Sequence, residues 1–98
     1  MLKAVWNDVV VAESDDIVVL EGNRYFPRAS LREDLVRPSE KHTVCLWKGR
    51  ASFYSLELDG ERCEDAVVYY PDPKPDAKSI RDRVYFSKDI KILDSTGE

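Results

Sequence analysis

Most of this chain consists of short runs of β-branched and aromatic residues, separated by two or three turn-forming residues. The first three runs are Lys3–Trp6, Val9–Glu13 and Ile17–Glu21, with corners at Asn7-Asp8 and Ser14–Asp16. Valine, isoleucine and aromatic side chains suit a pleated surface, and Asn, Asp and Gly adopt the backbone conformations of tight corners. The pattern therefore predicts a meander of short antiparallel strands.

The same pattern continues through the second half of the chain. Asp59-Gly60 is the strongest two-residue hairpin signal, and Lys48-Gly49 separates two further runs. More strands are expected over Arg24–Pro27, Thr43–Trp47, Ala51–Leu58, Ala66–Tyr70, Val84–Phe86 and Ile90–Leu93. Residues 93–98 are expected to form a flexible tail. The predicted fold class is mainly β, a single small domain of short antiparallel strands with two short helices.

The first helix is expected after the fourth run. Ser30–Glu33 fits a capping box, in which a serine and a glutamate three positions later satisfy the first free N–H groups of a helix. Leu31, Leu35 and Val36 share one helical face. Pro38 is expected to end the helix, because proline cannot continue its hydrogen bonding.

A proline-rich segment separates the last two parts of the chain. Residues 71–75 read Pro-Asp-Pro-Lys-Pro, and three prolines exclude both a helix interior and a central strand. We expect an ordered loop there. Asp76 is expected to cap a second short helix that runs through Ile80 to about Val84.

The size and charge of the chain limit its function. At 98 residues it is expected to be one domain with a single core. The net charge is −4 and no basic cluster is free of acidic neighbours, so no nucleic-acid partner is expected. No apolar run approaches the roughly 20 residues of a membrane span, so no membrane partner is expected either. Cys45 and Cys63 are expected to be free thiols of a cytoplasmic protein.

The stretch His42–Tyr54 concentrates the reactive residue types. His42 could withdraw the proton of Cys45 and create a nucleophilic thiolate, but strand positions three apart point to opposite faces. The spacing therefore favours a structural role for Cys45 over a catalytic one. His-x-x-Cys offers two of the four ligands of a structural zinc site, and we expect no metal and no other cofactor. Lys48 at a hairpin tip, beside the small Gly49, either contacts an anionic ligand or is a solvated turn lysine.

Ten aromatic side chains offer both a core and a ligand site. Burial of large rings stabilises a small β domain, which explains most of them without any ligand. Tyrosine hydroxyls need a hydrogen-bond partner or water and tend to lie at pocket rims. Tyr25, Tyr54 and Tyr70 are therefore the aromatic candidates for a binding site.

Several motifs follow one another over nearly the whole chain in a recognisable order: VWN, EGNRYFP, HTVCLWKGRASFYS, LDG and AVVYYPDPKP. This order resembles the bacterial and fungal family called domain of unknown function 427. The family patterns Tyr-Phe-Pro, Cys-Pro-Trp-Lys-Gly-x-Ala-x-Tyr and Trp-x-Tyr-Pro-x-Pro fall on residues 25–27, 45–53 and 68–73. Leu46 replaces the usual proline, Val68 the usual tryptophan and Phe53 the common tyrosine, so a ligand site built on those groups would differ here.

The resemblance implies a fold of the β-tent type, similar in architecture to methionine sulfoxide reductase B and to the ligand-binding domain of cereblon. Those proteins commonly bind zinc through paired Cys-x-x-Cys motifs, which this chain lacks, so the metal does not carry over. The family is also labelled nucleotidyltransferase-like, yet the chain has no Gly-Ser signature followed by paired acids. A fold alone does not confer an activity.

Together these observations predict a protein that binds a small molecule in an aromatic-lined cleft between its sheets. An enzyme that uses Cys45 and His42, or a nucleotidyltransferase-like activity, is one alternative. A structural module that associates through an edge strand, as a monomer or homodimer, is another. The candidate ligand-binding residues are Tyr25, His42, Cys45, Trp47, Lys48, Gly49, Tyr54 and Tyr70.

Overall fold

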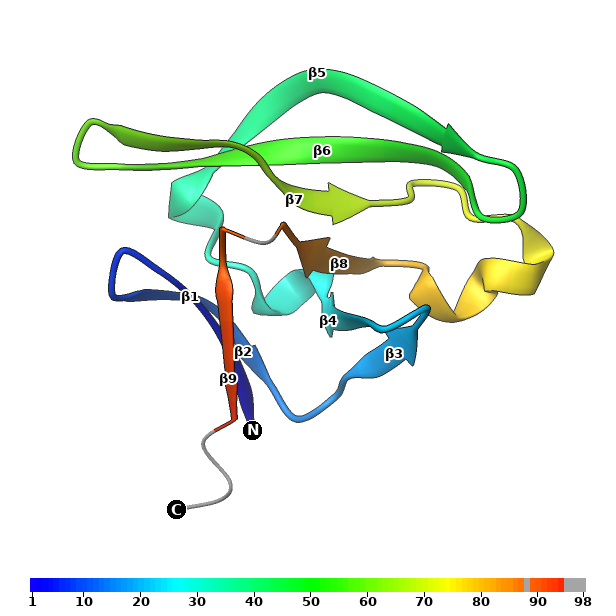
Figure 1. Ribbon diagram of the computed structural model, residues 1–98, viewed down its shortest axis with the longest axis horizontal. Helices are drawn as coiled ribbons and strands as arrows, with labels where there is room; N and C mark the ends of the chain where they lie inside the picture. Colours follow the sequence, from blue (N-terminus) through cyan, green and yellow to red (C-terminus); the bar gives the residue numbers. More distant parts are fainter. Residues whose placement is uncertain (88, 95–98) are drawn as a thin grey trace.

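Two antiparallel sheets make up the computed structural model, which describes residues 1–87 and 89–94 (Figure 1). The smaller sheet has the strand order β2-β1-β9, and the larger one has the order β3-β4-β8-β7-β6-β5. The mainly β class predicted from the sequence is confirmed. The strands of the smaller sheet are β1 (Leu2–Trp6), β2 (Val9–Ser14) and β9 (Lys91–Asp94). Those of the larger sheet are β3 (Val18–Leu20), β4 (Asn23–Pro27), β5 (Val36–Cys45), β6 (Gly49–Leu58), β7 (Glu61–Tyr69) and β8 (Arg83–Phe86).

Two-residue turns close the hairpins at the predicted corners. Asn7 and Asp8 both have positive φ, at 50° and 63°, between the paired ends of β1 and β2. Asp59 and Gly60, at 51° and 82°, join β6 to β7 in the same way. These φ values match the twist of the adjoining strands, which is why Asn, Asp and Gly occupy the turns.

The third tight turn joins β3 to β4. It consists of Glu21 and Gly22, with φ of 54° and 80°, between the register partners Leu20 and Asn23. Glutamate has no local preference for a left-handed backbone, unlike Asn, Asp or Gly. A contact elsewhere in the molecule must therefore stabilise Glu21 in this conformation.

The first predicted helix is replaced by two single 3₁₀ turns, η1 (Arg28–Ser30) and η2 (Glu33–Leu35). Leu31 and Leu35 are buried, as the helical pattern required, but Val36 and Pro38 belong to β5. A helix this short gains too few hydrogen bonds to offset its nucleation cost, so pairing with β6 prevails. Pro38 is tolerated because β5 is an edge strand whose pairing becomes irregular after it.

The second predicted helix is also a 3₁₀ segment, η3 (Pro75–Ile80), and its kink lies at Ala77. Asp76 makes no capping hydrogen bond, because Lys74 occupies the cap position and Pro75 follows it. Val84 lies in β8 rather than in a helix. Both short helices were thus expected in the right places but with the wrong hydrogen-bond pattern.

The chain after Ile90 differs slightly from the expected tail. Leu93 and Asp94 complete β9, where they pair with Lys3 and Leu2 of β1. Residues 95–98 of the predicted tail lie outside the described residues. Among the residues that the structure describes, no helix is long and apolar enough to span a membrane.

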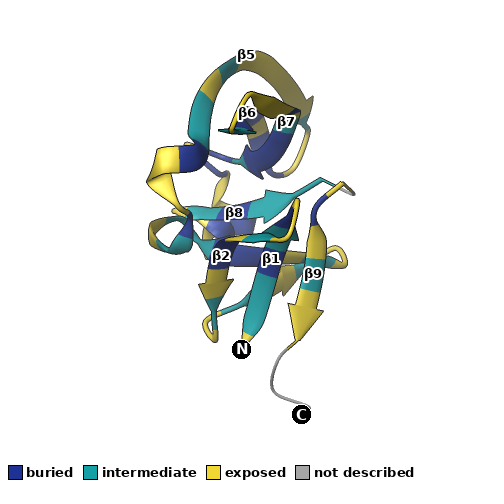
Figure 2. Ribbon diagram, turned by 90° about the vertical axis from the view of Figure 1, so that its left-hand side faces the viewer, coloured by how far each residue is buried: buried dark blue, intermediate teal, exposed yellow. Residues whose placement is uncertain are grey.

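The larger sheet separates two apolar cores. Figure 2 shows that ribbon segments of both sheets are buried. Consecutive residues of one strand serve different cores: Phe26 packs in the first and Tyr25 in the second, and Val67 and Val68 divide in the same way. The first core lies towards the smaller sheet and includes Trp6, Val11, Phe26, Leu35, Leu56, Val67, Val84 and Ile90. The second includes Tyr25, Ala51, Phe53, Val68, Tyr70, Ala77 and Ile80.

The proline-rich loop packs against the turn between β5 and β6. The backbone N–H of Lys74 donates to the carbonyl of Lys48 at 2.9 Å, and the Lys74 ammonium donates to the carbonyl of Leu46 at 2.6 Å. Gly49 has φ +115°, and a Cβ atom there would lie 3.2 Å from the carbonyl oxygen of Asp72. Any larger residue at position 49 would therefore strain the local backbone and push the loop backbone at Asp72 away from the turn.

We predict that Gly49→Ala lowers the free energy of unfolding by at least about 1 kcal/mol, from the positive φ alone, and further through the close approach to Asp72. The control is Gly60→Ala, because φ there is also positive, at +82°, but the added methyl group would meet open space. Urea denaturation of the two variants measures the difference. Equal destabilisation would contradict a packing role for Gly49.

Candidate functional site

An ion pair joins the two outermost hairpins of the larger sheet. The Lys48 ammonium, in the turn between β5 and β6, lies 2.6 Å from Oε1 of Glu21, in the turn between β3 and β4. The Trp47 indole N–H donates to the other carboxylate oxygen, Oε2, at 3.2 Å. Because β3 and β5 are the opposite edges of one sheet, this contact requires the sheet to curl until its ends meet.

Aromatic rings surround the Lys48 ammonium. Its Nζ lies 5.4 Å from the ring centre of Tyr70 and 5.7 Å from that of Trp47, distances at which a cation is attracted to the ring face. Only 7% of the Lys48 side chain is exposed. The aromatic residues that could have held a cationic ligand thus enclose the protein's own ammonium group.

The electrostatics of this cluster stabilise its charged state. The hydrogen bond from Lys48 lowers the pKa of Glu21, although burial works against it. Burial also opposes the charge of Lys48, but the hydrogen bond with Glu21 and the neighbouring tyrosines raise its pKa. Burial raises the pKa of Tyr25 strongly, and the Lys48 charge offsets part of this rise. At neutral pH the pair is therefore ionised and the phenol is not.

The Tyr25 hydroxyl is buried without a hydrogen-bond partner among the described residues. The whole residue is inaccessible to solvent, and its ring meets that of Tyr85 edge to face at 5.0 Å. Tyr25 therefore belongs to the second core rather than to the wall of an open cleft.

His42 and Cys45 lie on opposite faces of β5. His42 is exposed, and its Nδ1 is 3.1 Å from the hydroxyl of Ser52, its partner across the strands. Cys45 is half-buried and packs against the second core. The spacing argument from the sequence holds, and the geometry offers no hydrogen bond between thiol and imidazole.

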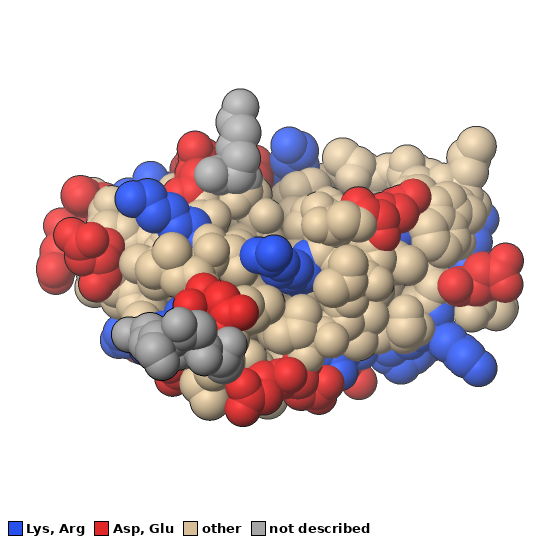
Figure 3. All heavy atoms as spheres, turned by 60° about the horizontal axis from the view of Figure 1, so that its bottom comes forward, with Lys and Arg blue, Asp and Glu red and all other residues tan. Residues whose placement is uncertain are grey.

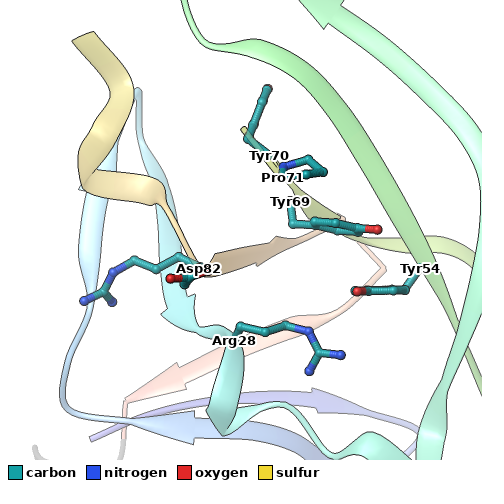
Figure 4. Close-up of a pocket in the computed structure, with 7 residues that line it drawn as sticks. Arg28, Tyr54, Tyr69, Tyr70, Pro71 and Asp82 are labelled. Atoms are coloured by element: carbon teal, nitrogen blue, oxygen red, sulfur yellow. The ribbon is translucent and has the colours of Figure 1, made fainter. Parts of the chain in front are cut away.

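A stacked pair of tyrosines forms an accessible aromatic surface. Tyr54 of β6 and Tyr69 of β7 have ring centres 4.4 Å apart and planes only 14° from parallel. The Arg28 guanidinium lies 5.0 Å from the centre of the Tyr54 ring. Figure 4 shows the two rings one above the other with Arg28 beneath them, while the Tyr70 side chain points away.

A pocket of about 180 Å³ opens beside this stack. The charged side chains that line it are those of Arg28, Arg83 and Asp82. Arg83 is already engaged, because its guanidinium donates to the carboxylate and the carbonyl of Asp16, each at 2.8 Å. The full lining is Arg28, Tyr54, Tyr69, Tyr70, Pro71, Asp82 and Arg83.

Arg28 carries the positive charge that faces the tyrosine stack. Its Nη2 pairs with Glu33, with the nearer carboxylate oxygen at 3.0 Å. Burial disfavours the charge, but contacts with Tyr54 and Glu33 outweigh that effect and raise the pKa of Arg28. Burial, together with the neighbouring Tyr54, raises the pKa of Tyr69. A guanidinium has five N–H donors, so Arg28 retains donors for a ligand.

The structure thus divides the predicted site residues into separate groups. Tyr25, Cys45, Trp47, Lys48 and Gly49 belong to the second core or to the turn that closes it. Tyr54 faces the open pocket, and His42 borders a neighbouring hollow. Tyr70 contributes to the pocket lining but directs its ring to Lys48.

Three important residues were missed by sequence reasoning: Glu21, Arg28 and Tyr69. Nothing local marks Glu21 as the partner of a lysine 27 positions away. A signal for Tyr69 was present, because consecutive residues of a strand point to opposite faces, so Tyr69 and Tyr70 direct their rings to different sides of the sheet. Arg28 follows the Tyr-Phe-Pro motif directly, but its position over Tyr54 depends on the fold.

Charged side chains are mixed over the surface. Acidic and basic groups are interspersed on the face shown in Figure 3. Over residues 1–87 and 89–94, no three His, Cys, Asp or Glu side chains come together as a possible metal site. The absence of a nucleic-acid partner stays a prediction.

We predict that Glu21→Gln reduces stability at neutral pH, since it leaves the Lys48 ammonium without its counter-charge. A carboxyl group whose pKa is lowered by folding stabilises the protein above its ordinary pKa, here 4.5, and loses that effect as the pH falls through the folded value. Lys48 has a raised pKa, so its contribution persists to at least its ordinary value of 10.5. The stability difference between wild type and variant should therefore be constant between these values and shrink in acid.

Denaturant unfolding across that pH range measures the difference. Glu64→Gln is the control, because Glu64 pairs with Arg62 on the surface and its side chain is mostly exposed. A difference for Glu21→Gln that does not change with pH, or one no larger than for Glu64→Gln, would argue against the ion pair as a stabilising contact.

Comparison with known proteins agrees with the motif order. A search of curated proteins found no match to the chain. The family model described as a domain of unknown function, DUF427, matches residues 1–95, which is nearly the whole chain. The resemblance seen in the sequence is confirmed, and the chain belongs to the domain of unknown function 427 family.

Proposed function

We propose that the protein binds a small molecule with a planar ring in the pocket beside Tyr54 and Tyr69. The observation that carries this proposal is the half-exposed, nearly parallel stack of the two rings at the pocket wall. Tyrosines in this arrangement offer a ligand a flat apolar surface together with hydroxyl groups.

The pocket volume limits the ligand. A cavity of about 150 Å³ holds one benzene ring, whereas drug-sized molecules need roughly 300 Å³ or more. The pocket has about 180 Å³ and is open on one side. It therefore suits a single ring, with any substituent extending out of it.

The polar groups of the pocket would orient a bound ring. Arg28 has N–H donors beyond those used by Glu33, and Asp82 provides an acceptor on the rim. A ring that carries a hydroxyl, carbonyl or anionic substituent would be positioned by them. This is the combination of apolar walls and few polar groups that is common in ligand sites.

The alternatives have less support. Catalysis by Cys45 and His42 would need the two side chains on one face of β5. A self-associating module would use the exposed Val44 and Leu46 at the end of β5, although the structure does not show what would cover them. We also propose a cytoplasmic location, because Cys45 and Cys63 are free thiols, as is usual in a reducing compartment.

We predict that benzyl alcohol, a neutral single-ring probe, binds and shifts the NMR signals of Tyr54 and Tyr69. Tyr69→Leu keeps an apolar side chain but removes the ring, so the affinity should fall about fivefold to tenfold, corresponding to about 1–1.4 kcal/mol of aromatic contact.

Phe86→Leu is the matched control, because Phe86 is a half-buried aromatic residue of the neighbouring strand β8 that does not line this pocket. It should leave the affinity unchanged. Shifts confined to other residues, or an equal loss of affinity in both variants, would refute the proposed site.

A further inference from the structure

A second hollow adjoins the ring pocket on the same face of the larger sheet. Its volume is about 210 Å³, and Pro71 lines both spaces. Ser52 of β6 is the register partner of both His42 in β5 and Tyr69 in β7, so these three residues form a row across the strands. The row leads from the tyrosine stack into the second hollow.

The second hollow contains an arginine whose side chain makes no ion pair or hydrogen bond with any described residue. This residue is Arg50, which lies two positions before Ser52 and therefore on the same face of β6. Of the eight arginines in the chain, six pair with a carboxylate, whereas Arg50 and Arg24 pair with none in residues 1–87 and 89–94. An exposed, unpaired guanidinium at the wall of a hollow is available to bind an anion.

His42 completes the donor set, and its ring is held by the contact with the Ser52 hydroxyl. Because the Ser52 hydroxyl contacts Nδ1 of His42, Nε2 is the ring nitrogen left for a ligand. Asp72 is the acidic residue of the lining and would repel an anion, but its exposed carboxylate lies 3.7 Å from the Arg81 guanidinium. The groups that face the hollow are thus predominantly hydrogen-bond donors.

We propose that the two hollows form one groove for a single ligand, a planar ring joined through a short spacer to a phosphate group. The proposal rests on the function inferred above. The ring lies beside Tyr54 and Tyr69, and the phosphate passes Pro71 to reach Arg50 and His42. The ring pocket is too small for both parts, so the charged group must leave it, and the adjoining hollow offers it the Arg50 guanidinium and Nε2 of His42.

The test compares benzyl phosphate with benzyl alcohol by NMR titration of the full chain. The two probes share the ring and differ in the phosphate. We expect benzyl phosphate to bind at least tenfold more tightly and to shift the signals of His42, Arg50 and Ser52 in addition to those of the tyrosines. Inorganic phosphate alone should bind more weakly than benzyl phosphate.

Arg50→Gln should remove most of this tenfold gain and leave the affinity for benzyl alcohol unchanged. Arg24→Gln is the matched control, because Arg24 is the other arginine without a partner among the described carboxylates, and it lines neither hollow. It should leave both affinities unchanged, whereas a nonspecific charge effect would weaken benzyl phosphate binding equally in both variants.

The outcomes separate the two proposals. If benzyl alcohol binds beside the tyrosines and the phosphate adds no affinity, the groove is refuted and the ring pocket stands. An equal loss in Arg50→Gln and Arg24→Gln also refutes the groove. If neither probe shifts Tyr54 and Tyr69, both proposals fail.

Discussion

The contact between Glu21 and Lys48 brings together the two ends of a six-stranded sheet. It connects the turn after β3 with the turn after β5, which are the hairpins at opposite edges. A glutamate in a left-handed backbone conformation and a lysine almost fully removed from water are each unfavourable alone. Each is stabilised by the other. The curl of the sheet, the enclosure of the second core and the shape of the open face all follow from this pairing.

The curl also separates the aromatic side chains into two sets. Tyr25, Trp47 and Tyr70 lie on the side of the sheet that closes around Lys48, whereas Tyr54 and Tyr69 lie on the other side, half-exposed against the first core and beside Arg28. The alternation of Tyr69 and Tyr70 along the end of β7 supplies one ring to each set. The proposed binding site therefore lies not where aromatic residues are densest in the sequence, but where two rings pack against the first core and remain half-exposed.

Local sequence signals predicted the fold well. Asn, Asp and Gly readily adopt the positive φ that Asn7-Asp8 and Asp59-Gly60 require, so both hairpins were predicted from the sequence. The alternating apolar pattern identified the strands that carry the two cores. Ser30–Glu33 resembled the start of a helix, but the choice between a short helix and edge pairing at Pro38 depends on β6, which is distant in sequence.

The site was harder to predict for the same physical reason. The sequence drew attention to Lys48 and Trp47, yet their partner Glu21 is defined only by the curl of the sheet. The pocket depends on the contact between the Arg28 guanidinium and the face of the Tyr54 ring. The two residues are 26 positions apart in the chain, and no local pattern marks this contact. Strand alternation, combined with the register set by the Asp59-Gly60 turn, would have assigned Tyr69, rather than Tyr70, to the face of Tyr54.

The most direct measurement of the central claim is a double-mutant cycle between Glu21 and Lys48. Glu21→Gln, Lys48→Met and their combination are compared by denaturant unfolding, with Arg62 and Glu64 as the reference pair on the surface. If the ion pair holds the two ends of the sheet together, the coupling free energy exceeds that of the reference pair, because the Lys48 ammonium is buried. Additive effects, or a coupling no larger than for Arg62 and Glu64, would contradict the account.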